Sequence, residues 1–148
     1  MYNEYTPKRI TELKTNEFFV FGSNLGGAHG DGAALLAYHK FGVVWGPGLG
    51  LQGQSYAIPT IQGGVETIKL YVDEFYSFSV KHPKYKFLVT RIGCGIAGFT
   101  PEEIAPFFFC AIELNNVVLP KDFVGVIQEM NSWINGFDSL TDRNAENF

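Results

Sequence analysis

The chain has 148 residues and a formal net charge of −4, and 46% of its residues are hydrophobic, including 14 Phe, 7 Tyr and 2 Trp. This length and composition predict one domain with a packed core and exclude a disordered chain. Lys and Arg are scattered, so we expect no broad nucleic-acid-binding surface. The two cysteines and three histidines are too dispersed for a disulfide scaffold or a zinc site, so we expect neither a metal nor another cofactor.

The chain also lacks the apolar segments that direct proteins to membranes. No apolar run reaches the ~18 residues of a membrane span, and the first residues contain no apolar signal-peptide core. We therefore expect a cytoplasmic protein without a membrane partner. Residues 1–137 are expected to form a single α/β domain, and the polar residues 138–148 are expected to be a loose tail.

The first predicted strand is Glu17–Gly22, an aromatic and β-branched run that ends in glycine. Residues 23–32 are too rich in glycine for regular structure and predict a loop. Ala33–Phe41 then predicts a helix, with Gly42 suited to its C-terminal cap. Val43–Gly53 predicts a second glycine-rich loop.

Ser55–Ile58 predicts a strand that stops at Pro59. Apolar residues at spacings of three and four then predict an amphipathic helix over Val65–Ser79. Lys86–Arg91 predicts another strand, which leads directly into the glycine-rich residues 92–99.

Thr100–Glu103 has the pattern of a helix start, with a capping box and a proline at the first helical position. Pro106 should bend that helix. Asn116–Leu119 predicts the last strand and Phe123–Trp133 a closing helix. Because strands alternate with helices, the predicted fold class is α/β, with a mixed, largely parallel sheet and helices on both faces.

Residues 18–37 and 87–104 share one pattern, which is an apolar strand, a glycine-rich turn and a helix. Ligands of open α/β sheets collect at the carboxyl ends of strands, where helix N-termini offer free N–H groups to phosphate. Two such loops side by side would clamp a diphosphate; the alternative is that the glycines only form tight turns. Neither loop has the Lys of a Walker loop, and no G-x-G-x-x-G precedes the first helix, which disfavours a dinucleotide-dependent dehydrogenase.

These segments resemble the macro domains, a family that binds ADP-ribose. Phe21–Asn24 followed by Gly30–Ala34 is similar to the first loop of the family, and Gly93–Phe99 is similar to its second loop, G-x-G-x-x-G-aromatic. The resemblance covers roughly Phe18 to Phe108. It implies a macro-domain-like three-layer α/β/α fold.

Within the family, Gly30–Gly42 and Arg91–Gly95 look most like the branch of terminal ADP-ribose–protein and ADP-ribosyl-DNA glycohydrolases. That branch uses a Lys after the middle strand and an Asp after the second loop, where this chain has Ile61 and Ala97. The resemblance therefore supports binding better than hydrolysis by that route.

The partner that the resemblance implies is ADP-ribose or an ADP-ribosylated substrate. Asn24 would hydrogen-bond a ribose, Gly30–Ala33 and Gly93–Gly98 would line the two sides of the diphosphate, and Phe99 would pack on the distal ribose. The candidate ligand-binding residues are Gly22, Ser23, Asn24, Gly30, Gly32, Ala33, Thr60, Arg91, Gly93, Cys94, Gly95, Ile96, Ala97, Gly98 and Phe99.

The candidates for catalysis are Asp31 and His29. Asp31 could position a water against the anomeric carbon, or it could simply cap the helix that follows. His29 is either a base or a loop residue with a polar partner.

Several other residues have two interpretations. Arg91 could pair with phosphate or form an ordinary surface ion pair, and Cys94 suits a small buried residue better than a nucleophile. Trp45 suits the core better than a stacking surface. Gln52, Gln54 and Ser55 are further candidates for contacting a base or ribose.

Three functions remain open at this point. The first is a module that binds ADP-ribose without turnover, and the second is an ADP-ribosyl hydrolase or ADP-ribose phosphatase that uses Asp31. The third is a nucleotide-sensing or interaction protein with a different ligand on the same scaffold.

Overall fold

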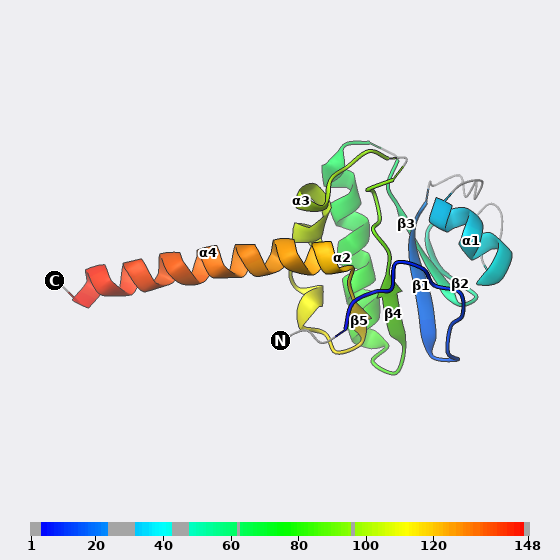
Figure 1. Cartoon of the computed structure of the whole chain (residues 1–148), viewed down its shortest axis with the longest axis horizontal. Coiled ribbons are helices and arrows are strands. Elements are labelled where there is room, and N and C mark those ends of the chain that lie inside the picture. The colour runs from blue at the N-terminus through cyan, green and yellow to red at the C-terminus, as the bar shows by residue number, and fades with distance from the viewer. Residues whose placement is uncertain (1–3, 24–31, 43–47, 62, 96, 147–148) are drawn as a thin grey trace.

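The computed structural model describes residues 4–23, 32–42, 48–61, 63–95 and 97–146 (Figure 1). They form one five-stranded sheet in the order β2–β3–β1–β4–β5. The strands are β1 (Glu17–Ser23), β2 (Gly50–Gln52), β3 (Ser55–Pro59), β4 (Lys86–Val89) and β5 (Val117–Val118). β1 is parallel to both of its neighbours, β3 and β4, and β5 is parallel to β4, while β2 is antiparallel to β3. The prediction of a mixed, largely parallel sheet is confirmed.

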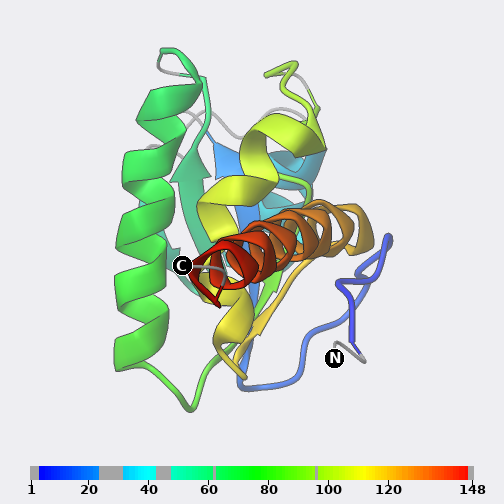
Figure 2. The ribbon, with the colours of Figure 1, turned by 90° about the vertical axis from the view of Figure 1, so that its left-hand side faces the viewer.

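Helices cover both faces of this sheet, so the domain has three layers. α1 (Gly32–Lys40) lies on one face, and α2 (Val65–Lys81), α3 (Pro101–Ile104) and α4 (Lys121–Glu146) lie on the other (Figures 1 and 2). The core has two parts, one on each face of the sheet, because successive side chains of β1 point to opposite faces. Phe19 and Phe21 pack with α1, whereas Phe18 and Val20 pack with α2 and its neighbours.

An aromatic cluster forms the centre of the larger core. Phe75 of α2 is fully buried, and its ring meets those of Tyr56, Phe87 and Phe108 edge-on at centroid distances of 5.1, 5.3 and 6.3 Å. Edge-to-face pairs of this kind add to the free energy of apolar burial. Phe75 therefore ties α2 to the strands beneath it and to the 3-10 helix η1 (Ala105–Phe108).

β2 falls inside the segment that we predicted to be a loop, and that prediction is wrong for Gly50–Gln52. The strand forms because Gly53 and Gln54 connect it to β3 as a tight hairpin, in which Gly53 has a φ of +56°. Gly42 has a φ of +79° after α1, as expected for a C-terminal cap. A Cβ added to Gly53 would lie 2.8 Å from the Cα of Gly42, so this contact requires glycine.

The helix after residue 99 begins as predicted and ends early. The Thr100 side chain accepts from the N–H of Glu103, and the Glu103 carboxylate accepts from the N–H of Thr100, which completes the capping box. Pro106 lacks an N–H, so α3 stops at Ile104 and continues as η1, followed by a second 3-10 helix, η2 (Ala111–Glu113).

α4 is longer than the closing helix that we predicted. It continues to Glu146 through residues that we expected to belong to a loose tail. The physical reason is that no proline interrupts residues 121–146 and no glycine follows Gly136. Figures 1 and 2 show the second half of α4 projecting away from the domain.

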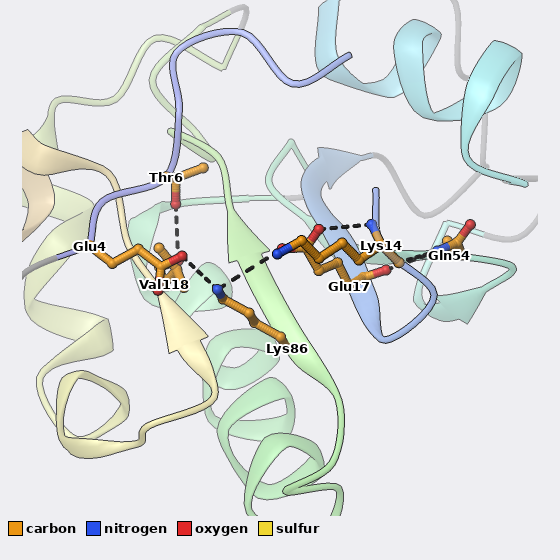
Figure 3. A network of polar contacts seen from close by, with 7 residues as sticks. All are labelled: Glu4, Thr6, Lys14, Glu17, Gln54, Lys86 and Val118. Carbon is orange, nitrogen blue, oxygen red and sulfur yellow. Dashed lines mark hydrogen bonds and ion pairs between the residues drawn. The ribbon is translucent and has the colours of Figure 1, made fainter. Parts of the chain in front are cut away.

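The segment before β1 is held across the outer strands by polar contacts (Figure 3). Thr6 donates through its N–H to Leu119 and through Oγ1 to Val118, at 2.9 and 3.0 Å. Lys86 Nζ lies 2.5 Å from Glu4 Oε1 and 4.0 Å from Glu17 Oε2. The Lys86 contacts lie at the amino-terminal end of β1, opposite the edge where its glycine-rich loop begins, and the Thr6 contacts hold the segment against the end of β5. None of the described helices is both long and apolar enough to cross a membrane.

Candidate functional site

Three strands end together at the carboxyl edge of the sheet. Because β1 is parallel to β3 and β4, Ser23 lies beside Pro59, and the N–H of Thr90, just beyond β4, donates to Val20 at 3.0 Å. The segments that follow these strands therefore leave the sheet side by side. This is the position where open α/β sheets bind ligands.

Gly22, Thr60 and Gly93 meet at this edge. A Cβ added to Gly22 would lie 3.2 Å from Thr60 Oγ1 and 3.5 Å from the backbone N of Gly93. Glycine at position 22 therefore lets the end of β1 approach the loop after β4. The beginnings of both glycine-rich loops are neighbours, as a clamp requires.

Buried polar groups stabilise the same edge. The Thr60 N–H donates to the Ser23 carbonyl at 2.8 Å, and Thr60 Oγ1 lies 3.4 Å from the same oxygen. The Ser23 hydroxyl donates to the carbonyl of Gly48. The sequence reasoning missed Gly48, whose only signal was its place in a glycine-rich run. These bonds hold the ends of β1 and β3 and the start of the β2 hairpin in one unit.

The described residues of the loop after β4, 92–95 and 97–99, are held together by backbone hydrogen bonds within the loop. Gly98 donates to Gly95 at 3.0 Å and Phe99 donates to Gly93 at 2.8 Å. Gly93 and Gly98 have φ values of +74° and +80°, which only glycine adopts without strain. Within the described part of the chain, the N–H groups of Gly93, Gly95 and Ala97 donate to no protein acceptor. Backbone N–H groups gathered in a glycine-rich turn form a concavity suited to anions.

Gly93 and Gly95 have different structural roles in this loop. A Cβ on Gly93 would lie 3.2 Å from Ile104 Cδ1, so this residue is needed for packing against α3. A Cβ on Gly95 would meet no atom of the described residues within 4 Å, and Gly95 is exposed. None of the described residues therefore crowds Gly95, and it is the position where a ligand could approach the backbone.

Arg91 forms an ion pair, which was one of its two predicted roles. Its Nε lies 2.6 Å from Asp122 Oδ2 in the first turn of α4, and the two side chains are 57% and 39% exposed. An exposed pair of this kind contributes little to stability. Contact between Arg91 and a phosphate would require this pair to separate.

Cys94 is partly buried and packs against the larger core. Burial raises the pKa of its thiol; the Arg91 charge opposes this shift, while Asp122, Glu102 and Glu103 add to it. The thiol is therefore protonated at neutral pH, which agrees with a structural residue rather than a nucleophile.

This protonation state predicts slow alkylation of Cys94. In a Cys110→Ala variant, iodoacetamide should modify Cys94 more slowly at neutral pH than it modifies a free thiol. The rate should rise as the pH passes the usual range of a cysteine, because only the thiolate reacts. The Cys94→Ala variant, which retains the exposed Cys110, is the matched control. Fast modification at neutral pH with no pH dependence would contradict a raised pKa.

Two further candidate residues, Ala97 and Phe99, lie at the end of the second loop. Phe99 and Ala97 are partly buried, and Phe99 packs against the core beside Gly93. Ile61, at the position of the Lys in the glycohydrolase branch, is 51% exposed after β3.

Part of the first loop lies outside the described residues. This applies to Asn24, His29, Gly30 and Asp31, and also to Trp45 and Ile96, whose predicted roles stay predictions. Gly32 and Ala33 are the first residues of α1, so the described chain shows both ends of this loop. Ser23 closes the strand and Gly32 opens the helix, as the predicted strand–turn–helix unit requires.

Gln54 and Ser55 are not part of this site. They lie at the amino end of β3, at the opposite edge of the sheet from Thr60. Gln54 Nε2 donates to the carbonyls of Lys14 and Glu17 at 2.9 and 3.2 Å (Figure 3), and Ser55 is buried with its hydroxyl bonded to Phe41. Gln52 pairs with Ser55 in the hairpin, so it lies at that edge too.

A shallow groove of about 410 Å³ runs along α2 beside Tyr56. Asp73 and Glu74 line it, and burial together with the Glu74 charge raises the pKa of Tyr56 to about 12. None of its lining residues belongs to a glycine-rich loop. Lys81 also lines the groove, so acidic and basic side chains are mixed there.

No cluster of three or more His, Cys, Asp or Glu residues suited to a metal ion occurs in the described ranges. A scan of protein-family models, a search of curated proteins and a search of solved structures each give no significant match to this chain.

Proposed function

We propose that this chain binds ADP-ribose, or a closely related nucleotide diphosphate, between its two glycine-rich loops. The observation that carries the proposal is the meeting of Gly22, Thr60 and Gly93 at one sheet edge. Beside it lies a loop in which the N–H groups of Gly93, Gly95 and Ala97 have no acceptor among the described residues. A diphosphate has enough oxygens to accept from both loops at once. A single phosphate would engage only one of them.

The ligand would be held mainly by the backbone. The candidate loops contain no lysine, and the chain has a net charge of −4. The overall charge of the protein therefore does not attract anions. Glycine-rich turns and helix N-termini bind phosphate through aligned N–H groups without side-chain charge. Binding through backbone N–H groups selects a ligand by its shape and by the spacing of its phosphates.

The resemblance to macro domains supplies the identity of the proposed ligand. It rests on Phe21–Asn24, Gly30–Ala34 and Gly93–Phe99, and the three-layer fold agrees with what it implies. In this proposal Asn24 contacts a ribose and Phe99 packs on the distal ribose.

We propose binding without turnover by the route of the glycohydrolase branch. The side chains of Ile61 and Ala97 stand where that branch has Lys and Asp, and neither can donate or accept a proton. Any hydrolysis would then depend on Asp31, and Asp31→Ala should abolish it with little change in affinity.

A thermal-shift panel tests this function. ADP-ribose at about 100 times its dissociation constant should add ~2.7 kcal/mol of stability, which raises the Tm of a domain of this size by about 5–10 °C. The panel includes AMP, ADP, NAD and ribose-5-phosphate as competing ligands. A larger shift with a nucleotide other than ADP-ribose would favour the nucleotide-sensing alternative, and no shift with any of them would refute the proposed site.

A further inference from the structure

The groove along α2 contains a buried polar group without a protein partner. Tyr56 lines this groove and is only 5% exposed, and no described residue forms a hydrogen bond with its hydroxyl. Buried hydroxyls are normally hydrogen-bonded, to protein, to water or to a ligand, because an unsatisfied one costs free energy. Burial and the nearby Glu74 charge raise the pKa of Tyr56 to about 12, so the hydroxyl is protonated at neutral pH and can both donate and accept.

Two charged side chains of α2 line the same groove. Glu74 and Lys81 are exposed, and neither forms an ion pair with another described residue. Asp73, the other acidic residue of the groove, is already paired with Lys69 at 2.7 Å. The groove therefore offers one carboxylate and one ammonium group for a ligand to engage. Figure 2 shows α2, coloured green, at the left side of the molecule.

The spacing of these charges sets the length of a ligand that reaches both. Glu74 and Lys81 are seven residues apart, which places them on one face of α2 and about 10.5 Å apart along its axis. An extended chain of five methylene groups between an ammonium and a carboxylate spans about 7 Å, and the flexible Glu and Lys side chains can close the remaining distance.

The surface between the two charges is apolar. Phe78 lies four residues after Glu74 and three before Lys81, and its ring packs on that of Tyr56 at a centroid distance of 5.3 Å. Both residues line the groove, whose volume of about 410 Å³ lies in the range of small-molecule sites. An apolar chain laid along the groove would therefore meet aromatic side chains between its charged ends.

We propose that this groove binds a small zwitterion whose ammonium and carboxylate groups are separated by a flexible apolar chain, as in an ω-amino acid. The ammonium group pairs with Glu74 and donates to the Tyr56 hydroxyl, while the carboxylate pairs with Lys81. The two charges also select against simpler ligands, because Lys81 repels a diamine and Glu74 repels a dicarboxylate. The glycine-rich loops take no part in this site, so it does not depend on the proposed binding of ADP-ribose.

Titration of the whole chain with 6-aminohexanoate, followed by heteronuclear NMR spectra, tests the site. We expect shifts of backbone amides in α2 and β3 and a dissociation constant of about 1 mM, since the ligand is small and the groove is open. Hexylamine and hexanoate carry only one of the two charges and should each bind at least about fivefold more weakly. No shift of α2 resonances at about 20 mM 6-aminohexanoate, or equally tight binding of either singly charged compound, would overturn the proposal.

Three variants test the role of each group. Glu74→Gln and Lys81→Gln should each weaken binding of 6-aminohexanoate by about fivefold, because each removes one ion pair. Tyr56→Phe should weaken binding by a similar factor without lowering the free energy of unfolding, because the hydroxyl that it removes has no described protein partner. Glu66→Gln and Lys84→Gln, exposed and outside the groove, are the matched controls and should bind like the parent. A Tyr56→Phe variant that lost stability but kept the parent's affinity would contradict the role of the hydroxyl.

A peptide distinguishes a free zwitterion from the end of a protein chain, because a carboxyl-terminal lysine carries the same two charges at the same separation. Ala-Ala-Lys with a free carboxylate should bind no more tightly than 6-aminohexanoate. Tighter binding of the peptide would overturn the small-molecule assignment in favour of a carboxyl-terminal lysine. The amidated peptide should bind at least about fivefold more weakly than the free acid. Equal binding of the two peptides would contradict the pairing of a carboxylate with Lys81.

Discussion

Gly95→Val is expected to weaken ADP-ribose binding by about 100-fold while the free energy of unfolding stays within ~0.5 kcal/mol of the parent value. The fold should tolerate the change because a Cβ at this position meets no atom of the described residues within 4 Å and the φ of Gly95 is not positive. The branched side chain would fill the space in front of the N–H groups of Gly95 and Ala97. Losing two hydrogen bonds to a charged ligand costs roughly 3 kcal/mol or more, which gives the expected factor.

Gly125→Val is the matched control for this experiment. Gly125 is also exposed, and a Cβ there likewise meets no atom of the described residues within 4 Å, but it belongs to α4 and not to the second loop. Isothermal titration of both variants with ADP-ribose measures the difference. Equal affinity in Gly95→Val and in the parent would show that the loop after β4 does not contact the ligand.

Phe75→Ala is expected to have the largest effect on stability, a loss of about 3–5 kcal/mol in the free energy of unfolding. Phe75 is fully buried and packs edge-on against Tyr56, Phe87 and Phe108, so its removal leaves a cavity that three rigid rings cannot close. Urea denaturation followed by circular dichroism measures the loss.

Leu70→Ala is the control on the same helix. Leu70 is 66% exposed, and its truncation should change stability by no more than ~0.5 kcal/mol. If Phe75→Ala lost less than ~1 kcal/mol, the aromatic cluster would not be the centre of the core.

The strands were predictable because they are short runs of buried aromatic and β-branched residues. Both faces of β1 are covered, so Phe18 to Phe21 form a continuous apolar run that no loop would have. β2 was not predictable in this way, because Gly50–Gln52 has no apolar run and its strand depends on the hairpin with β3. The length of α4 was underestimated because polarity was taken as a sign of disorder, although polar residues are compatible with a helix.

Only the parts of the candidate site that depend on the local sequence could be predicted. The glycines at 93 and 98 have positive φ, and the turn that they form was visible in the spacing of the second loop. The meeting of Gly22 with Thr60 and Gly93 depends on the parallel pairing of three strands, which follows from topology and not from any one segment. Gln54 was misplaced because nearness in sequence to a loop does not say at which end of a strand a residue lies.

The most direct test of the central claim is calorimetric titration of the parent chain with ADP-ribose, AMP and ribose-5-phosphate under identical conditions. If the ligand spans both glycine-rich loops, ADP-ribose should bind at least about tenfold more tightly than either fragment, since only its diphosphate reaches both sets of N–H groups. Equal affinity for ADP-ribose and AMP, or no binding of ADP-ribose, would contradict the clamp between Gly22 and Gly95.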